Sequence, residues 1–165
     1  MHEPLRFAVF GTGFWSHFQI PAWQEAGGVE LMALYNRTGS KAAKTAEKFG
    51  VPRWFDDPRR LLDEVPIDFM DIITEINGHA PLVRLAAERK IPVICQKPMA
   101  PDLQTAEEMV RICREAGIPF LVHENWRWQT PIRALAESLR SGVIGKVFRA
   151  RLEMISGFPV FVNQP

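Results

Sequence analysis

Short apolar segments alternate with longer amphipathic segments over residues 1–123. The short segments have the length and composition of strands buried on both faces, whereas the segments between them have helical periodicity. This alternation predicts parallel β–α–β units and therefore an α/β fold, a doubly wound parallel sheet with helices on both faces. Strands are expected at 7–10, 29–35, 67–74, 91–95 and 118–123. Helices are expected at 13–25, 41–49, 57–64, 81–89 and 102–117.

The pattern changes after residue 123. A further helix is expected from Thr130, which precedes a proline, to about Gly142. Residues 146–156 then alternate polar and apolar side chains with a period of two, which is typical of a half-buried antiparallel strand. Because such a strand does not belong to the parallel series, the chain is expected to divide into residues 1–123 and residues 124–165.

Composition excludes several classes of protein. The 165 residues include 20 basic and 19 acidic side chains, and this near balance argues against binding of nucleic acid. No apolar run approaches the ~20 residues that cross a bilayer, and the N-terminus lacks the pattern of a signal peptide, so we expect a cytoplasmic protein without a membrane partner. Cys95 and Cys113 lie in apolar stretches and are expected to be reduced and buried. No spacing of side chains indicates a metal site.

A glycine-rich turn directly follows the first expected strand and opens the first expected helix. Its sequence, Gly-Thr-Gly-Phe-Trp-Ser from Gly11 to Ser16, matches the dinucleotide-binding fingerprint with serine in place of the third glycine. Gly11 permits the tight turn, and Gly13 lets the backbone approach a pyrophosphate held by helical N–H groups. A glycine turn without a ligand is the alternative. The remaining turn residues assigned to the cofactor site are Thr12, Phe14 and Trp15.

The second expected strand ends in Asn36-Arg37-Thr38, with Lys41 shortly after. NAD enzymes place an Asp or Glu here to accept from the ribose 2′-hydroxyl, and this sequence has none. An amide, a guanidinium and a hydroxyl favour a 2′-phosphate instead, so NADP is the preferred cofactor and NAD the alternative. The same string resembles the NADP clamp of shikimate dehydrogenases, and the missing carboxylate counts against methyltransferases. A solvated turn is the structural alternative.

Polar residues follow the ends of three later strands. Residues 74–79 follow the third expected strand, residues 95–100 the fourth and residues 123–128 the fifth. Because the carboxyl ends of parallel strands meet at one edge of a sheet, all three segments are expected to converge on one crevice. The residues assigned to the cofactor site from the first two segments are Thr74, Glu75, Asn77, His79, Gln96 and Lys97.

Purely structural roles remain open for several of these side chains. His79 begins an expected helix and is equally compatible with local hydrogen bonding. Lys97 precedes a turn-forming proline and is compatible with a surface position. Trp15, Trp126 and Trp128 are candidates for the wall of a nicotinamide pocket, although aromatic residues more often fill a core.

Taken in order, these segments resemble those of a known family. The order of motifs resembles that of the glucose–fructose oxidoreductase / inositol dehydrogenase (Gfo/Idh/MocA) family. The motifs are the glycine turn at Gly11, the Thr…His segment at 74–79, the Lys97-Pro98 pair and the Asn-x-Arg of Asn125 and Arg127. The resemblance implies an NAD(P)-dependent enzyme acting on sugars, cyclitols and related polyols. It also implies that Lys97 donates or accepts the proton at the substrate oxygen, and that Asn125 and Arg127 orient substrate or pack at a hinge.

Three features depart from the family pattern. Gln96 stands where members usually carry glutamate, and Glu75 stands where proline is frequent. The resemblance also implies a second α/β domain that supplies an Asp-x-x-x-His pair, and no aspartate precedes a histidine by that spacing here. Residues 1–123 are therefore expected to form a Rossmann domain, and residues 124–165 the junction and the beginning of a truncated C-terminal α/β substrate domain.

Two functions are compatible with these observations. The leading hypothesis is an oxidoreductase that transfers a hydride between a nicotinamide and a carbinol or carbonyl carbon of a sugar-like substrate. The alternative is a dinucleotide-binding module without turnover, either a sensor or a fragment. In both cases an unpaired strand at 146–156 predicts either a disordered C-terminal tail or association with a second copy of the chain through this region.

Overall fold

The computed structural model describes residues 3–153 and 155. The chain divides into two compact units, Met1–Glu124 and Asn125–Pro165. The first unit contains a complete sheet with its helices, and it holds every strand found in the described residues.

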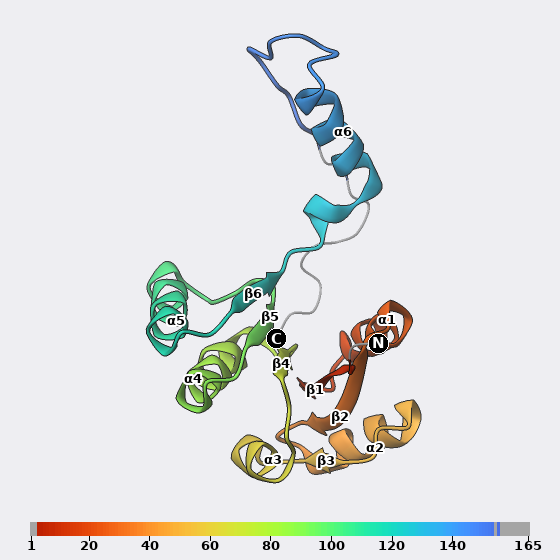
Figure 1. Ribbon diagram of the computed structural model, residues 1–165, viewed down its shortest axis with the longest axis vertical. Coiled ribbons are helices and arrows are strands. Elements are labelled where there is room, and N and C mark those ends of the chain that lie inside the picture. The colour runs from red at the N-terminus through yellow and green to blue at the C-terminus, as the bar shows by residue number, and fades with distance from the viewer. Residues whose placement is uncertain (1–2, 154, 156–165) are drawn as a thin grey trace. The chain divides into compact units, whose positions relative to one another are not determined.

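The first unit is a six-stranded parallel sheet in the order β3-β2-β1-β4-β5-β6 (Figure 1). This is the strand order of the Rossmann fold, and it reverses between β1 and β4. The predicted fold class is therefore confirmed. The strands are β1 (Leu5–Phe10), β2 (Val29–Tyr35), β3 (Trp54–Phe55), β4 (Phe69–Ile72), β5 (Val93–Gln96) and β6 (Phe120–His123). The helices are α1 (Ser16–Ala26), α2 (Gly39–Phe49), α3 (Pro58–Glu64), α4 (His79–Arg89) and α5 (Leu103–Ala116), with a 3₁₀ turn η1 (Ile76–Gly78) before α4.

Apolar side chains cover both faces of the sheet, which explains why the strands read as continuous apolar runs. On one face Phe10 and Met70 belong to a core with residues of α3, α4 and α5. On the other face Phe7 and Val9 pack with residues of α1 and α2. Figure 1 shows α4 and α5 on one side of the sheet and α1 and α2 on the other.

Local signals set several helix boundaries. The Asp57 carboxylate accepts from the backbone N–H groups of Arg59 and Arg60 and so begins α3. The Asp102 carboxylate accepts from the N–H of Thr105 at 2.7 Å and begins α5. Gly117 ends α5 in the left-handed conformation that glycine adopts most readily.

The structure moves several element boundaries in this unit by one to three residues and adds one short strand. The helix expected from residue 13 begins at Ser16, because the preceding residues form the glycine turn. The strand expected at 67–74 is limited to Phe69–Ile72. The two-residue strand β3, Trp54–Phe55, was not predicted, since two residues are too short to show any periodicity.

The second unit contains a 3₁₀ turn, η2 (Trp126–Trp128), and the helix α6 (Thr130–Arg140). The strand predicted at 146–156 is wrong over residues 146–153 and 155, which have no regular secondary structure, while residues 154 and 156 lie outside the described part. A strand is stabilised by hydrogen bonds to a neighbouring strand, and this segment has no such neighbour in the described chain. Alternation of polar and apolar side chains therefore does not by itself produce a strand. None of the helices in the described residues is long and apolar enough to span a bilayer.

Both cysteines are free and buried, Cys95 in β5 and Cys113 in α5. Burial raises the pKa of the Cys95 thiol to about 12, and burial also raises the pKa of Cys113. Because the thiolate is the reactive form, we expect neither thiol of the native protein to be alkylated by iodoacetamide at mildly alkaline pH. Both should be alkylated in denaturant, as measured by mass spectrometry. Rapid alkylation of Cys95 in the folded protein would contradict this packing.

Candidate functional site

The turn between β1 and α1 is the structural centre of the site. Gly11 has φ +120°, and its N–H donates to the Tyr35 carbonyl at 2.8 Å. A Cβ at Gly11 would lie 2.8 Å from backbone atoms of Ile73 and Thr74, so no other residue fits there. A Cβ at Gly13, in contrast, would meet nothing within 4 Å, and Gly13 is exposed. The turn thus closes against the end of β4 and leaves open space in front of Gly13.

Serine at the third position of the fingerprint has a clear structural role. Ser16 is fully buried at the first residue of α1, and its hydroxyl donates to the Gly13 carbonyl at 2.7 Å. The small side chain permits close packing of α1 on the sheet, while the hydrogen bond fixes the turn.

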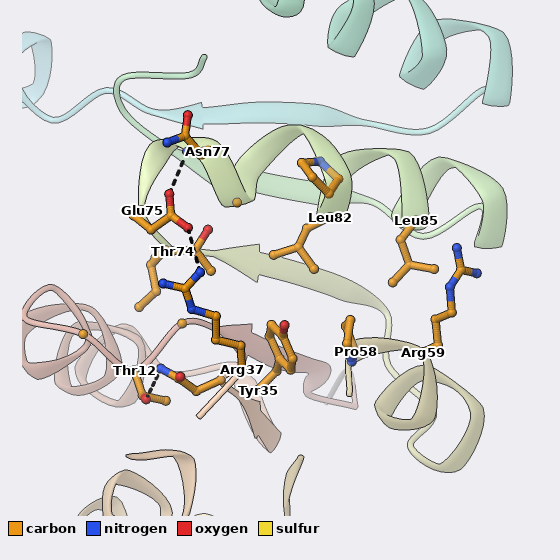
Figure 2. Close-up of a pocket in the computed structure, with 16 residues that line it drawn as sticks. Thr12, Tyr35, Arg37, Pro58, Arg59, Thr74, Glu75, Asn77, Leu82 and Leu85 are labelled. Atoms are coloured by element: carbon orange, nitrogen blue, oxygen red, sulfur yellow. Dashed lines mark hydrogen bonds and ion pairs between the residues drawn. The ribbon is translucent and has the colours of Figure 1, made fainter. Parts of the chain in front are cut away.

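A pocket of about 670 Å³ lies beside this turn, at the carboxyl ends of β1, β2 and β4 (Figure 2). Tyr35, Pro58, Leu82 and Leu85 give it an apolar part, and burial raises the pKa of the Tyr35 hydroxyl. Its lining residues are Gly11, Thr12, Gly13, Tyr35, Asn36, Arg37, Pro58, Arg59, Ile73, Thr74, Glu75, Asn77, Gly78, Pro81, Leu82 and Leu85. A pocket with an apolar part and a polar part suits a ligand that combines a flat ring with a ribose and phosphates.

Asn36 ties the end of β2 to the glycine turn. Its amide Nδ2 donates to the Thr12 hydroxyl at 2.7 Å, and its carbonyl Oδ1 accepts from the Thr38 N–H at 2.9 Å. Both ends of the amide are therefore engaged by the protein. The side chain thus shapes the loop that a ligand would meet, and the second hydrogen of Nδ2 is compatible with the predicted contact to phosphate.

Arg37 extends across the polar end of the pocket toward Glu75 (Figure 2). The guanidinium and the carboxylate are 4.0 Å apart, and 81% of the Arg37 side chain is exposed. Glu75 also accepts from the Asn77 N–H at 2.9 Å and so fixes the η1 turn. An exposed pair at this separation is weak, so Arg37 is free to bind another anion.

Lys41 does not line the same pocket as Arg37. It borders a second hollow of about 660 Å³ with His17, Lys44 and Lys48, and Thr12 lines both hollows. Within it the Lys48 ammonium lies 3.0 Å from Nδ1 of His17. Of the residues that the sequence groups as one clamp, Asn36 and Arg37 line the first hollow, Lys41 lines the second, and Thr38 lines neither.

Lys97 follows β5 and lies close to the start of α1. It is exposed, and its ammonium is 5.9 Å from the ring centroid of Trp15. Its backbone N–H donates to Oε1 of the buried Gln96 at 2.8 Å, which orders the residue at the strand end. Phe14, next to Trp15, is 73% exposed.

Two buried polar atoms flank the glycine turn without a hydrogen-bond partner among the described residues. They are Nε1 of Trp15 and Oγ1 of Thr74. Buried polar groups are nearly always paired, so such atoms mark a place where a ligand or ordered water completes the structure. Together with the open space at Gly13, they fit a bound dinucleotide.

His79 lies in the protein interior at the start of α4. Its Nδ1 is 3.2 Å from the Met99 carbonyl and its Nε2 is 3.1 Å from the Thr74 carbonyl. The imidazole joins the loops that follow β4 and β5, which is the locally hydrogen-bonded alternative and not a side chain lining the pocket. Asn125 and Arg127 lie in the second unit. Asn125 directly precedes η2, and Arg127 is its middle residue.

A buried polar cluster was missed by the sequence interpretation. Asp71 in β4 is fully buried, and its carboxylate faces Gln19 and Trp23 of α1 and His123 of β6. A carboxylate within a strand that is buried on both faces is unusual, and this was the signal available in the sequence. No group of three or more metal-ligating side chains occurs among residues 3–153 and 155.

The family model of the Gfo/Idh/MocA oxidoreductases, described as an oxidoreductase family with an NAD-binding Rossmann fold, matches residues 5–124. The chain belongs to this family. Its first unit is accordingly an NAD(P)-binding domain, as the glycine turn predicted.

Several relatives match nearly all of this chain. The D-apiose dehydrogenase of Rhizobium rhizogenes is 42% identical over 161 residues, which cover 98% of this chain and 47% of the relative. The D-apiose dehydrogenase of Paraburkholderia graminis is 40% identical, with 96% and 42% covered. The crystal structure of an oxidoreductase from Agrobacterium radiobacter in complex with NAD⁺, L-tartaric acid and magnesium superposes with a TM-score of 0.84 at 41% identity, over 88% of this chain and 42% of that one. The chain thus spans less than half the length of these relatives.

Substitutions at the two turn glycines should separate folding from binding. We expect Gly11→Ala to lower the free energy of unfolding by about 1–3 kcal/mol, because alanine at φ +120° is strained and its Cβ meets the β4 backbone. Gly13→Ala should leave the unfolding free energy within about 0.5 kcal/mol of wild type but weaken dinucleotide binding, since its Cβ enters the open space. Chemical denaturation and NADH titration measure the two effects. Equal effects of both substitutions on stability would contradict the geometry.

Proposed function

We propose that this chain is the cofactor-binding part of an NAD(P)-dependent oxidoreductase that acts on a sugar- or cyclitol-like substrate. The observation that carries the proposal is the position of Lys97, beside the first turn of α1 that begins at the glycine turn. A proton-transferring group beside the nicotinamide end of a dinucleotide site is what alcohol oxidation requires. The relatives named as D-apiose dehydrogenases, and the related structure that contains NAD⁺, support the same reading.

The described residues suggest how the cofactor is held. The open backbone at Gly13 receives the pyrophosphate, and the apolar part of the pocket at Tyr35, Pro58 and Leu82 receives the adenine. Arg37 would contact the group at the ribose 2′ position, and Trp15 would lie against the nicotinamide. When bound, the nicotinamide accepts or donates the hydride. The protein positions the reacting atoms and handles the proton.

Lys97 is the candidate catalytic residue. Its ammonium or amine is positioned to give or take the proton at the substrate oxygen while hydride transfer occurs at the adjacent carbon. Asn125 and Arg127 begin the second unit and are proposed to orient substrate at the junction with a C-terminal α/β substrate domain, which would start at about residue 124. We further propose a cytoplasmic location and association between copies through the C-terminal region.

Binding without turnover is the second candidate function. The glycine turn and the pocket beside it would hold a dinucleotide equally well in a protein without turnover. A protein that binds NADH but oxidises none of a panel of sugars and cyclitols, D-apiose included, would support this candidate.

Arg37 should decide between the two nicotinamide cofactors. A charged hydrogen bond contributes about 1.5–3 kcal/mol, so we expect Arg37→Ala to weaken NADPH binding about tenfold or more and to leave NADH binding nearly unchanged. Arg59→Ala is the matched control, because Arg59 lines the same pocket but pairs with Glu88. Fluorescence titration with each cofactor gives the affinities. Equal losses for NADPH and NADH would exclude a 2′-phosphate contact.

Lys97 should serve the chemical step more than cofactor binding. We expect Lys97→Met to reduce kcat for D-apiose oxidation by roughly 10²–10⁴, the usual contribution of acid–base catalysis, with NADH affinity retained. Lys90→Asn is the control, since Lys90 is exposed at the end of α4 and has the left-handed backbone that asparagine tolerates. A variant at Lys97 with near-normal kcat would show that another group transfers the proton.

A further inference from the structure

Asp71 is a fully buried carboxylate near the carboxyl end of β4. Its exposed fraction is 0%, and three donors surround it. Oδ2 accepts from Nε1 of Trp23 at 2.6 Å and from Nε2 of Gln19 at 3.3 Å, while Nε2 of His123 lies 3.1 Å from Oδ1. A buried carboxylate persists only where such donors replace water, so the cluster has a defined geometry.

The cluster lies next to the candidate catalytic lysine. In the parallel pairing of β5 and β6, His123 is the partner of Gln96, and Lys97 is the following residue. Trp15, Gln19 and Trp23 recur every four residues from the start of α1, so they lie along one face of the helix. Trp15 contacts Lys97, and Gln19, one turn further, contacts His123. His123 and Lys97 thus belong to adjacent strand ends, and their side chains meet α1 at positions one turn apart.

The orientation of the Gln19 amide is fixed by the carboxylate. With Nε2 toward Asp71 the amide donates to Oδ2, whereas the opposite orientation would put a carbonyl oxygen 3.3 Å from a carboxylate oxygen. The same Nε2 of Gln19 is only 2.7 Å from Nε2 of His123. A donor and an acceptor thus compete for a single nitrogen of the imidazole.

This competition leaves two tautomers of His123 accessible. With the proton on Nε2, the ring donates to Asp71 and presents an acceptor at Nδ1. With the proton on Nδ1, the ring accepts from Gln19 at Nε2 and presents a donor at Nδ1. In ordinary His–Asp pairs one partner fixes the tautomer, whereas here each form satisfies one of two partners. Nδ1 itself has no hydrogen-bond partner among the described residues, and 24% of the side chain is exposed.

We propose that His123 relays the proton that Lys97 exchanges with the substrate oxygen, with Asp71 and Gln19 positioning its imidazole. The proposal rests on the proposed function of Lys97. It adds a relay residue that acts through the lysine and does not touch the substrate. The two tautomers match the two directions of a reversible dehydrogenation, since one accepts a proton at Nδ1 and the other donates one.

In the oxidising direction the proton passes from the substrate oxygen to Lys97, from Lys97 to His123 and from His123 to solvent. The substrate C–H bond breaks and its hydride passes to the nicotinamide, while the substrate O–H bond breaks as an N–H bond forms at the Lys97 amine. That N–H bond then breaks as an Nδ1–H bond forms on His123, directly or across one bridging water. The Asp71 carboxylate stabilises the imidazolium, which releases a proton to solvent.

Nuclear magnetic resonance of ¹⁵N-labelled imidazoles tests the relay without any substrate. We expect both ring nitrogens of His123, assigned with His123→Asn, to have chemical shifts between those of protonated and unprotonated nitrogens. Gln19→Leu removes the competing donor and should move Nε2 to the protonated value. Lys97→Met should shift the His123 signals, and Lys90→Asn should not. A single tautomer that is the same in wild type and Gln19→Leu, or signals indifferent to Lys97→Met, would overturn the proposal.

Kinetics then test the consequence for turnover. In the protein assayed with NAD⁺ and D-apiose, His123→Asn should lower kcat about tenfold or more while KM and NADH affinity stay within about threefold, and imidazole should restore kcat to His123→Ala. A joint fall in NADH affinity and melting temperature without rescue would show a structural role only and would overturn the relay. If wild type oxidises no sugar, the proposed function fails, and the resonance measurements still decide whether Lys97 and His123 are coupled.

Discussion

The close approach of Gly11 to the end of β4 is the constraint on which the site depends. At φ +120° the turn after β1 lies against the backbone of Ile73 and Thr74, where no side chain fits. This contact occurs at the point where the strand order reverses, between β1 and β4. The glycine turn therefore forms one wall of the crevice and the segment after β4 forms the other. Asn36 and Ser16 then fix the turn from the β2 side and from α1.

The sequence predicted the sheet well because its strands are buried on both faces, and such strands carry a strong signal of their own. It failed where a structure depends on a distant partner. Polar and apolar side chains alternate along residues 146–153, but the described chain offers no neighbouring strand to pair with them. The strand β3 has only two residues, which are too few to show a periodicity. Arg37 and Lys41 are close in sequence but line different hollows, because the direction of a side chain after a strand end is set by packing. The pair of Asp71 and His123 joins residues 52 positions apart, which no local motif reports.

Charged groups are arranged differently at the two ends of the proposed cofactor site. At the ribose end Arg37 and Glu75 are exposed and 4.0 Å apart, so solvent weakens their attraction and either group is available to a ligand. At the nicotinamide end the carboxylate of Asp71 is buried beneath α1, and its donors hold α1, β4 and β6 together. The exposed end suits selection between cofactors, whereas the buried end suits precise placement of the groups that move a proton.

We propose that the glycine turn and its pocket bind a nicotinamide dinucleotide with the nicotinamide close to Trp15. Titration of the protein with NADH, excited at the tryptophan band and followed at the nicotinamide emission, tests this most directly. We expect saturable binding with energy transfer from tryptophan to the nicotinamide, and a larger fall of that transfer in Trp15→Phe than in Trp54→Phe at saturating NADH. Absence of saturable binding, or energy transfer that is unchanged by Trp15→Phe, would contradict it.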